Sequence, residues 1–290
     1  MKRILVTGSN GQLGNHLRLK DNAPDNTEFL FTDLPELDIT NESDVENILD
    51  KFNPNWVVNC AAYTAVDKAE QDVSLCNKLN AEAPALLAKL TDKHRCRLIH
   101  ISTDYVFGGD GSKPYKEDHP KNPQGIYARS KSLGEDLVLV NNPRSIIVRT
   151  SWLYSIFGNN FMKIVLRICS EKGAIRVVSD QTGTPTWAGD LAEGIMTLIS
   201  KDAAPGIYHF SNEGICSWYD FAKAIVEIKN INCKIEPILT KDYPTPAIRP
   251  HYSVLDKTHF KSVTGVEIPW WYDSLVVCLK QFYETENRPT

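Results

Sequence analysis

Short apolar runs alternate with longer amphipathic segments through the first 150 residues. The runs are rich in β-branched and aromatic residues and predict buried strands: RILVTG, EFLFTD, WVVNCAA, RLIHIS and SIIVRT. The segments between them carry apolar residues three and four positions apart, as amphipathic helices do: GQLGNHLRLK, SDVENILDKF, AEAPALLAKLTDKH and YARSKSLGEDLVLV. This order predicts right-handed βαβ crossovers, and hence a parallel sheet covered by helices.

The pattern loosens after residue 150. We expect a helix at about 160–172, then a strand at RVVS and a loop at DQTGTPTWAGD. GDLAEGIMTLIS and GIYHFS are apolar enough to return to the first sheet as a helix and a strand. The remainder predicts a helix at WYDFAKAIVEI, a strand at KIEPIL, a loop at YPTPAIRPHYS and a helix at WYDSLVVCLKQFY. The fold class is therefore α/β, with a doubly wound parallel sheet from residues 1–150 and about 186–212, and a smaller, discontinuous α/β lobe from about 151–185 and 213–290.

Composition narrows the choice of partners. The chain has 290 residues, of which 42% are hydrophobic and 23% charged, as in ordinary globular proteins. Its formal net charge of -4 gives no general attraction to nucleic acid or to an anionic membrane. No uncharged apolar run approaches the roughly 18 residues that cross a bilayer. We expect neither nucleic acid nor a membrane as a partner.

The start of the chain and its cysteines bear on its compartment. MKRILVTGSNG becomes polar too soon for the core of a signal peptide, so a cytoplasmic protein is expected. The seven cysteines are an odd number without a Cys-x-x-Cys pair or zinc-finger spacing. We expect them to be reduced thiols.

A glycine-rich loop joins the first strand to the first helix. In GSNGQLG, Gly8, Gly11 and Gly14 are three residues apart, which departs from the Gly-x-Gly-x-x-Gly of many dehydrogenases. Glycines there allow a tight turn, the approach of a pyrophosphate and close packing of helix on strand. The predicted cofactor loop also includes Asn10, Gln12 and Leu13. Asp33 ends the second strand, where an acidic side chain accepts hydrogen bonds from the adenosine ribose; a plain loop aspartate is the alternative.

Tyr127 and Lys131 are four residues apart within a predicted helix. That spacing puts them on one helix face, where an ammonium can favour the phenolate and allow proton exchange near neutrality. Eleven tyrosines make such a pair common by chance, so the spacing alone is equally typical of a solvated helix face.

Four segments in chain order, GSNGQLG, VVNCAAYTAVDKAE, HISTDYVFGG and YARSK, resemble the extended short-chain dehydrogenase/reductase family. Three others, RTSWLY, DQTGTPT and YPTPAIRPHYSVLD, are similar to its dTDP-4-dehydrorhamnose reductase branch. The resemblance spans nearly the whole chain. It implies an NAD(P)-binding Rossmann domain, a nucleotide-sugar-binding lobe, and a role in dTDP-rhamnose biosynthesis for cell-surface polysaccharide.

The resemblance also implies a reaction. NADPH or NADH would reduce the C4 carbonyl of a dTDP-linked 4-keto-6-deoxysugar, dTDP-4-dehydro-L-rhamnose, to give dTDP-L-rhamnose. Tyr127 would supply the proton, Lys131 would favour the phenolate and contact the nicotinamide ribose, and Thr103 would be the hydroxyl partner.

Further contacts follow from the same resemblance. Asp38 and Ile39 would contact the adenine of the cofactor. The residues after the third strand would also line the cofactor: Ala61, Ala62, Tyr63 and Thr64. Substrate contacts fall on Thr103, Asp104, Tyr127, Trp152 and Arg249. Trp152 would stack on the pyranose, with core packing as the alternative. Arg249 would meet the diphosphate, with an ordinary surface arginine as the alternative.

Some members of the branch form magnesium-bridged dimers through acidic residues, but His16 and Gly189 occupy the matching positions here. We therefore expect no metal, and a monomer or a magnesium-independent dimer. Two other interpretations stay open. One is a nucleotide-sugar epimerase or a reductase of another 4-keto sugar. The other is a non-catalytic NAD(P)-binding regulatory subunit resembling that of methionine adenosyltransferase, against which Thr103, Tyr127 and Lys131 argue.

Overall fold

The computed structural model describes residues 1–19 and 26–286. Lys20, the last residue of the predicted helical segment GQLGNHLRLK, lies outside the described residues. Within the described ranges, no helix is both long enough and apolar enough to span a membrane.

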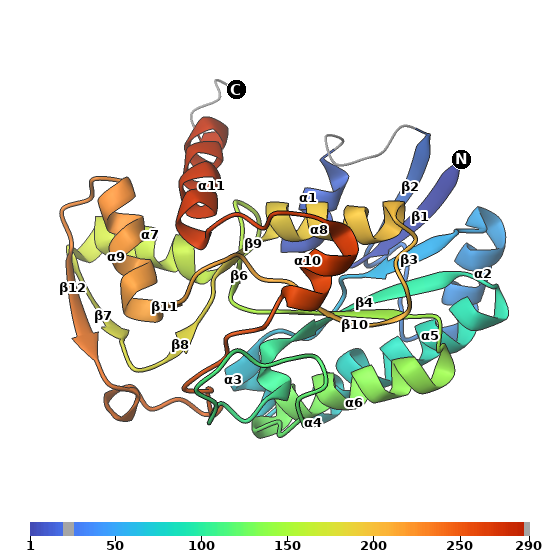
Figure 1. Cartoon of the computed structure of the whole chain (residues 1–290), viewed down its shortest axis with the longest axis horizontal. Helices are drawn as coiled ribbons and strands as arrows, with labels where there is room; N and C mark the ends of the chain where they lie inside the picture. The colour runs from blue at the N-terminus through green and yellow to red at the C-terminus, as the bar shows by residue number, and fades with distance from the viewer. Residues whose placement is uncertain (20–25, 287–290) are drawn as a thin grey trace.

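A six-stranded parallel sheet forms the larger part of the fold (Figure 1). Its strands are β1 (Lys2–Thr7), β2 (Thr27–Thr32), β3 (Trp56–Asn59), β4 (Arg97–Thr103), β5 (Ile146–Thr150) and β10 (Gly206–His209), in the order β10-β5-β4-β3-β1-β2. All five predicted strands of the first half are confirmed. GIYHFS also returns to the sheet, since β10 pairs with β5. The order reverses between β1 and β3, which is the point where open α/β sheets bind ligands at the carboxyl ends of their strands.

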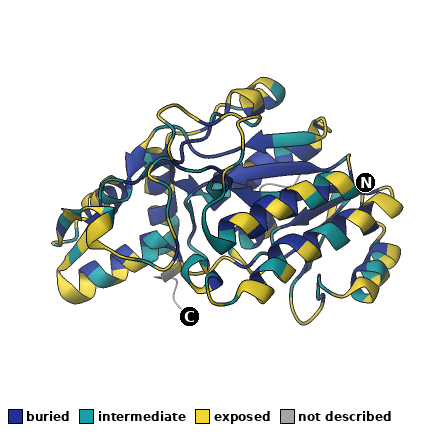
Figure 2. Cartoon of the chain, turned by 90° about the horizontal axis from the view of Figure 1, so that it is seen from below, coloured by how far each residue is buried: buried dark blue, intermediate teal, exposed yellow. Residues whose placement is uncertain are grey.

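Helices cover both faces of this sheet. Alternate strand residues, such as Leu5 and Val6, point to opposite faces and enter separate apolar clusters. One face is covered by α1 (Gln12–Arg18), α8 (Ala188–Ser200) and α10 (Thr258–Thr264), and the other by α2 (Glu42–Phe52), α5 (Ala83–Lys93) and α6 (Gly125–Asn141). Figure 2 shows the strands buried between helices whose outer faces are exposed. This is the Rossmann-like doubly wound arrangement that the alternation of runs predicts.

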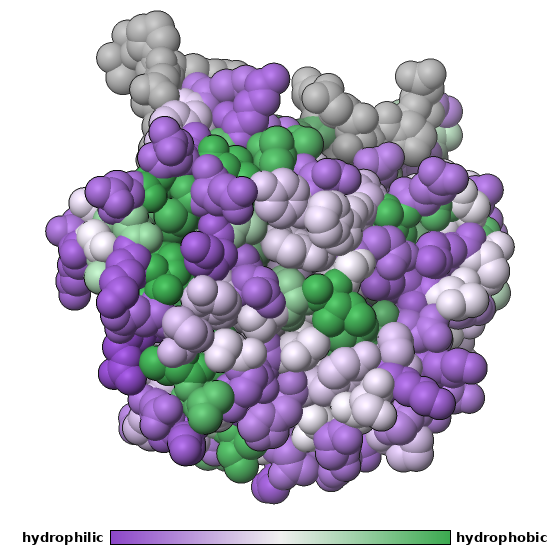
Figure 3. All heavy atoms as spheres, turned by 60° about the vertical axis from the view of Figure 1, so that its left-hand side comes forward, coloured by the Kyte–Doolittle hydropathy of each residue, from purple (hydrophilic) through white to green (hydrophobic). Residues whose placement is uncertain are grey.

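The second lobe packs around its own apolar cluster. It contains α7 (Phe161–Lys172), α9 (Trp218–Ile228), α11 (Trp271–Glu286) and a parallel pair, β7 (Ala174–Val178) and β12 (Lys234–Ile238). Local signals explain the helix ends: Gly173, with φ +66°, ends α7, and Ser217 and Asp220 form a capping box at the start of α9. Figure 3 shows hydrophobic side chains in separate patches on the outer surface of this side of the molecule.

Several short elements have no clear sequence signal. They are α3 (Val66–Ala69), α4 (Val73–Asn77), the π-helical turn η2 (Lys78–Glu82), α10, the 3-10 turns η3 (Asp104–Val106) and η4 (Thr240–Asp242), and the two-residue strands β6 (Leu153–Tyr154), β8 (Thr182–Gly183), β9 (Thr186–Trp187) and β11 (Cys216–Ser217). The expected loop DQTGTPTWAGD thus contains two of these strands and the start of α8. Elements of two to seven residues are too short to display a period.

The expectation of seven reduced thiols is wrong for one pair. Cys169 and Cys233 form a disulfide, although they are 64 residues apart in sequence. The pairing of β7 with β12 begins at Ala174 and Lys234, directly after Gly173 and Cys233, and brings the end of α7 beside this turn. A tertiary contact of this kind is invisible in cysteine spacing.

Candidate active site

Two adjoining cavities lie at the carboxyl ends of the strands, where the strand order reverses. The larger, of about 610 Å³, lies between the glycine loop, the ends of β3, β4 and β5, helix α6 and the second lobe. The smaller, of about 280 Å³, is bordered by the glycine loop and the residues that follow β2 and β3. Gly11, Cys60 and Ala62 line both. The two cavities together therefore form an elongated site across the sheet.

The glycine loop is built by close backbone approaches. Gly8 has φ +64°, and a β-carbon there would lie 2.5 Å from the backbone nitrogen of Ala61 at the end of β3. A β-carbon on Gly14 would lie 2.4 Å from Cα of Ser9, so α1 packs directly on the loop. Gln12 and Leu13 line the larger cavity, whereas Asn10 and Gly14 line neither. The loop thus presents backbone to the cavities, as the spacing predicts.

Asp33 ties the end of β2 to this loop. Its carboxylate accepts hydrogen bonds from the backbone N–H groups of Asn10 and Leu34, both at 2.9 Å. It lines the smaller cavity with Asp38 and Ile39. Hydrogen bonds from Thr40 hold the pKa of Asp38 below its ordinary value. Of the residues expected after the third strand, Ala61 and Ala62 line the smaller cavity, and Ala62 and Thr64 line the larger.

Thr103 and Tyr127 meet in the larger cavity. Burial raises the pKa of the Tyr127 hydroxyl above its ordinary value, and a side-chain hydrogen bond with Thr103 acts in the opposite direction. The Thr103 hydroxyl donates to Asp104 Oδ1 at 3.0 Å. Burial raises the pKa of the Asp104 carboxyl to about 6, against hydrogen bonds that lower it. A phenol, a hydroxyl and a carboxyl therefore converge at the end of β4.

Lys131 lies one turn after Tyr127 and is buried, with 2% of its surface exposed. Its Nζ donates to the carbonyl oxygen of Ile101 at 2.7 Å and lies 3.2 Å from Nε2 of His100. Burial lowers the pKa of Lys131 to about 8. The structure therefore excludes the solvated helix face, because this face of α6 packs against β4.

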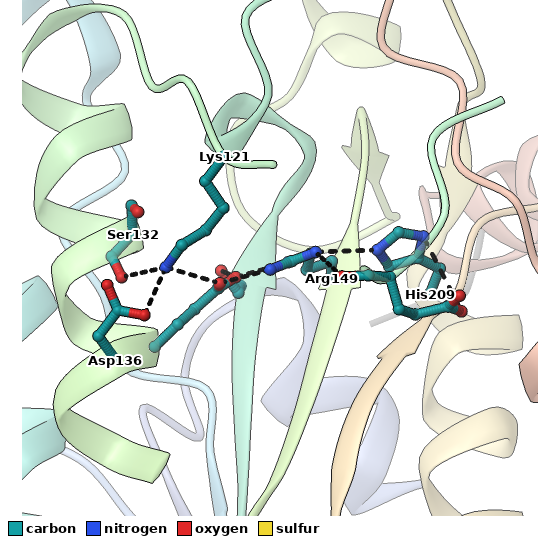
Figure 4. A network of polar contacts seen from close by, with 8 residues as sticks. Lys121, Ser132, Asp136, Arg149 and His209 are labelled. Atoms are coloured by element: carbon teal, nitrogen blue, oxygen red, sulfur yellow. Dashed lines mark hydrogen bonds and ion pairs between the residues drawn. The ribbon is translucent and has the colours of Figure 1, made fainter. Parts of the chain in front are cut away.

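A buried ionic network fastens α6 to the sheet (Figure 4). Glu135 and Arg149 are each about 1% exposed in their side chains and form two charge-assisted hydrogen bonds, of 2.9 and 2.8 Å. Glu135 also accepts from the Ser102 hydroxyl at 2.6 Å and lies 3.5 Å from Lys121. Arg149 extends the network to His209 on β10. Since Glu135 follows Lys131 by one turn, the network fixes the helix that carries the Tyr127–Lys131 pair.

Trp152 lines the larger cavity from the second lobe. Its indole stacks on Trp218 with ring centroids 3.7 Å apart and planes 9° from parallel. A β-carbon on Gly183 would lie 2.6 Å from Cε2 of Trp152, and the Trp152 backbone has φ +48°. The ring is therefore held between Gly183 and Trp218, with part of its surface facing the cavity. Sequence reasoning missed Trp218, because it lies 66 residues beyond Trp152 in an unremarkable amphipathic helix.

Besides Asn10 and Gly14, two more predicted site residues, Tyr63 and Arg249, line neither cavity. The Tyr63 hydroxyl donates to Asp72 at 2.8 Å, and its backbone N–H donates to Asn80. The guanidinium of Arg249 makes two hydrogen bonds to Asp67, of 3.0 and 2.7 Å. It thus already has an anionic partner. Other residues that line the larger cavity and that sequence reasoning did not assign to the site include Cys60, Val66, Ser151, Gly158 and Asn159.

His16 and Gly189, the positions that suggested magnesium independence, lie outside both cavities. His16 contacts the Ser155 hydroxyl at 3.0 Å and packs edge-on against Phe157 and Trp187, and burial lowers its pKa to about 4. In residues 1–19 and 26–286, no group of three or more His, Cys, Asp or Glu side chains is arranged to hold a metal ion. The independence from magnesium stays a prediction.

Comparison with known proteins agrees with this geometry. A family model described as RmlD substrate binding domain matches residues 1–284. The dTDP-4-dehydrorhamnose reductase of Aggregatibacter actinomycetemcomitans is 42% identical over 289 residues, covering 95% of this chain and 97% of the relative. A Streptomyces antibioticus protein named probable dTDP-4,6-dihydroxy-2-methyloxan-3-one 4-ketoreductase is 40% identical over 292 residues, covering 99% and 98%. The solved structure of dTDP-4-dehydrorhamnose reductase from Bacillus anthracis in complex with NADP superimposes with a TM-score of 0.93 at 38% identity, covering 97% of this chain and 100% of that one.

Proposed function

Because the chain belongs to the RmlD substrate-binding family, we propose that it is an NAD(P)H-dependent oxidoreductase that reduces the C4 carbonyl of dTDP-4-dehydro-L-rhamnose to give dTDP-L-rhamnose. The arrangement of the side chains supports this function independently of the resemblance. Thr103, Tyr127 and Lys131 converge on the same cavity that Gly11, Gln12 and Leu13 of the glycine loop line. An acid, its hydroxyl partner and a buried cation thus face the region where a reduced cofactor would be held.

The residues fit a dinucleotide cofactor. Gly8 and Gly11 present backbone to the smaller cavity, and Asp33, Asp38 and Ile39 line its far side, which suits an adenosine. Thr64, Tyr127 and Lys131 line the larger cavity, where they would hold the nicotinamide end. Bound NADPH or NADH supplies the hydride. The Tyr63 side chain would not contact the cofactor, since its phenol donates to Asp72.

Tyr127 supplies the proton in this proposal. Burial keeps its hydroxyl protonated before the reaction. As negative charge develops on the C4 oxygen, Tyr127 transfers its proton there, and the positive charge of Lys131 stabilises the phenolate that remains. The Thr103 hydroxyl would form a hydrogen bond with the C4 oxygen of the substrate or with the Tyr127 hydroxyl. The product gains one hydride and one proton, so the charges balance.

The sugar would lie between the strand ends and the second lobe. Asp104 would accept a hydrogen bond from a sugar hydroxyl, and the exposed surface of Trp152 would stack on the pyranose. Arg249 would contact the diphosphate only if it exchanged Asp67 for it. We propose that residues 1–150 and about 186–212 bind the cofactor and that about 151–185 and 213–290 bind the nucleotide sugar.

Another dTDP-linked 4-keto sugar is the second candidate substrate, because the Streptomyces antibioticus relative is named for one and is 40% identical. Purified protein should oxidise NADPH in the presence of dTDP-4-dehydro-L-rhamnose, followed by absorbance and by mass spectrometry of the sugar. Faster turnover of a different dTDP-4-keto sugar would favour the second candidate. Cofactor binding without turnover of either would favour a regulatory subunit and contradict the proposal.

Trp152→Phe provides a test of the sugar contact. A smaller ring retains the stack on Trp218 but loses part of the surface offered to the pyranose, so affinity for dTDP-L-rhamnose should fall by about 0.5–1.5 kcal/mol. Calorimetric titration measures this, with Trp270→Phe as control, since Trp270 is half exposed and lines neither cavity. Unchanged affinity in Trp152→Phe would remove Trp152 from the substrate site.

The proposal also includes a monomer or a magnesium-independent dimer in the cytoplasm, where reduced nicotinamide cofactors are available. His16 and Gly189 support the independence from magnesium, since neither has the side-chain carboxylate that would supply oxygen ligands to magnesium.

A further inference from the structure

A buried chain of polar side chains next to Lys131 has no part in the reaction described above. It runs from Thr7 on β1 through Asn59 at the end of β3 to His100 on β4. Asn59 and His100 are both 0% exposed. Buried polar atoms of this kind are expected to be hydrogen-bonded, and those of Asn59 and His100 find their partners within the protein.

The partners of Asn59 fix the orientation of its amide. Its Oδ1 accepts from the Thr7 hydroxyl at 2.8 Å and from the backbone N–H of Ala61 at 3.1 Å. The opposite orientation would set an NH₂ group against the Ala61 N–H, with two donors facing each other. Nδ2 of Asn59 is therefore the donor to Nδ1 of His100, 3.0 Å away.

This contact fixes the tautomer of His100. Nδ1 accepts a hydrogen bond, and a neutral imidazole carries one N–H, so the proton is on Nε2. Burial, with the charge of Lys131 adding to it, lowers the pKa of His100 well below its ordinary value and keeps the ring neutral. Nε2 is 3.2 Å from Nζ of Lys131.

We propose that His100, held by Asn59 with its proton on Nε2, is a positioning residue that presents an N–H donor to Lys131 and so favours the neutral amine over the ammonium. An amine accepts this hydrogen bond through its lone pair, whereas an ammonium has only donors and would face another donor across 3.2 Å. Both forms can donate to the Ile101 carbonyl. The inference rests on the proposed reductase function, in which Lys131 acts beside Tyr127.

Burial and the other titratable groups around Lys131 also influence its pKa. Burial is the main influence and lowers the pKa of Lys131 to about 8, while Glu135 on α6 and Cys76 on α4 raise it. Tyr127 precedes it by one turn on α6, and His100 faces it from β4. The ammonium is thus present at neutral pH and is lost just above it. Turnover that needs this charge should decline over the same interval.

The first test uses the unaltered protein and needs no turnover. Nitrogen-15 spectra of histidine-labelled protein distinguish a protonated ring nitrogen from an unprotonated one, and the loss of one set of signals in His100→Asn identifies His100. We expect an unprotonated Nδ1 and a protonated Nε2. A proton on Nδ1 would overturn the inference.

The second test measures Lys131 directly. Its side chain is titrated by carbon-13 NMR of lysine-labelled protein, and Lys131→Met identifies the signal. In His100→Asn the amide oxygen can replace Nδ1 as the acceptor for Asn59, while the NH₂ group of this shorter side chain does not extend to the position of Nε2. The pKa of Lys131 should therefore rise by about one unit. The alkaline limb of the kcat profile should move by the same amount. His94→Asn, at the end of α5 and outside both cavities, is the matched control and should change neither.

A rise smaller than about half a unit in His100→Asn overturns the inference, whatever happens to the rate. A merely structural role for His100 would lower stability or rate without moving the alkaline limb. If the wild-type protein binds NADPH but turns over no 4-keto sugar, the proposed function fails while both NMR results still decide the role of His100. If His100→Asn does not fold, sequential assignment of the wild-type spectrum identifies the His100 signals, and the wild-type tautomer alone decides the question.

Discussion

Replacing Tyr127 by phenylalanine should reduce turnover by about 10²- to 10⁴-fold, the loss typical of a general acid. The ring would still pack edge-on against Tyr105, whereas the transferable proton would be gone. Affinity for NADPH should change little, because the glycine loop and the smaller cavity are untouched. Steady-state kinetics and a fluorescence titration with NADPH measure the two quantities on one preparation.

Tyr208→Phe is the matched control for Tyr127→Phe. Tyr208 is also buried, and its hydroxyl donates to the carbonyl oxygen of Ala204, outside both cavities. Its loss should cost about 0.5–1.5 kcal/mol of stability and leave turnover near that of the wild type. A Tyr127→Phe protein that keeps more than about a tenth of the wild-type rate would show that another group donates the proton.

Arg149→Met should lower the free energy of unfolding by about 3–5 kcal/mol, because it leaves Glu135 buried and without its main partner. Lys121, 3.5 Å from the carboxylate, compensates only in part, since it also pairs with Asp136. The effect should appear in chemical denaturation as a lower midpoint with an unchanged slope.

Arg144→Met is the control for Arg149→Met, since Arg144 pairs with Asp92 where the side chains are 43% and 48% exposed. It should cost no more than about 1 kcal/mol. The double variant Arg149→Met with Glu135→Leu should recover much of the lost stability, because no unpaired charge stays buried. If Arg144→Met and Arg149→Met lowered the free energy of unfolding equally, the buried pair would contribute no more to stability than an exposed one.

The sheet was predictable from sequence because its strands are buried on both faces. A run such as RILVTG is apolar without alternation, and the structure explains this: Leu5 packs toward α2 and α5, and Val6 toward α1 and α8. Periods of three and four residues gave the long helices for a related reason, since one stripe of each faces the sheet. The glycine loop followed from its place between a strand and a helix.

Features that join distant segments were not predictable. Helical spacing puts Lys131 beside Tyr127 but does not say which face of α6 is buried, and β4 decides that. Trp218, the Cys169–Cys233 disulfide and the Asn59–His100 contact each depend on two elements meeting in space. Arg249 illustrates the converse: its sequence position suggested an anion, and the structure supplies one from the protein itself, Asp67.

The return of β10 to the edge of the sheet has a consequence for how such a protein can be recombined. A fragment that ended at residue 150 would expose β5 as an open edge and strip Leu191, Ile195 and Ile199 of α8 from the apolar cluster beneath β1 and β3. Exchange of the second lobe between relatives by a single crossover would therefore produce chimaeras with a mismatched sheet edge. Productive chimaeras need three junctions, one after β5, one before α8 and one after β10, so that each sheet keeps its own last strand.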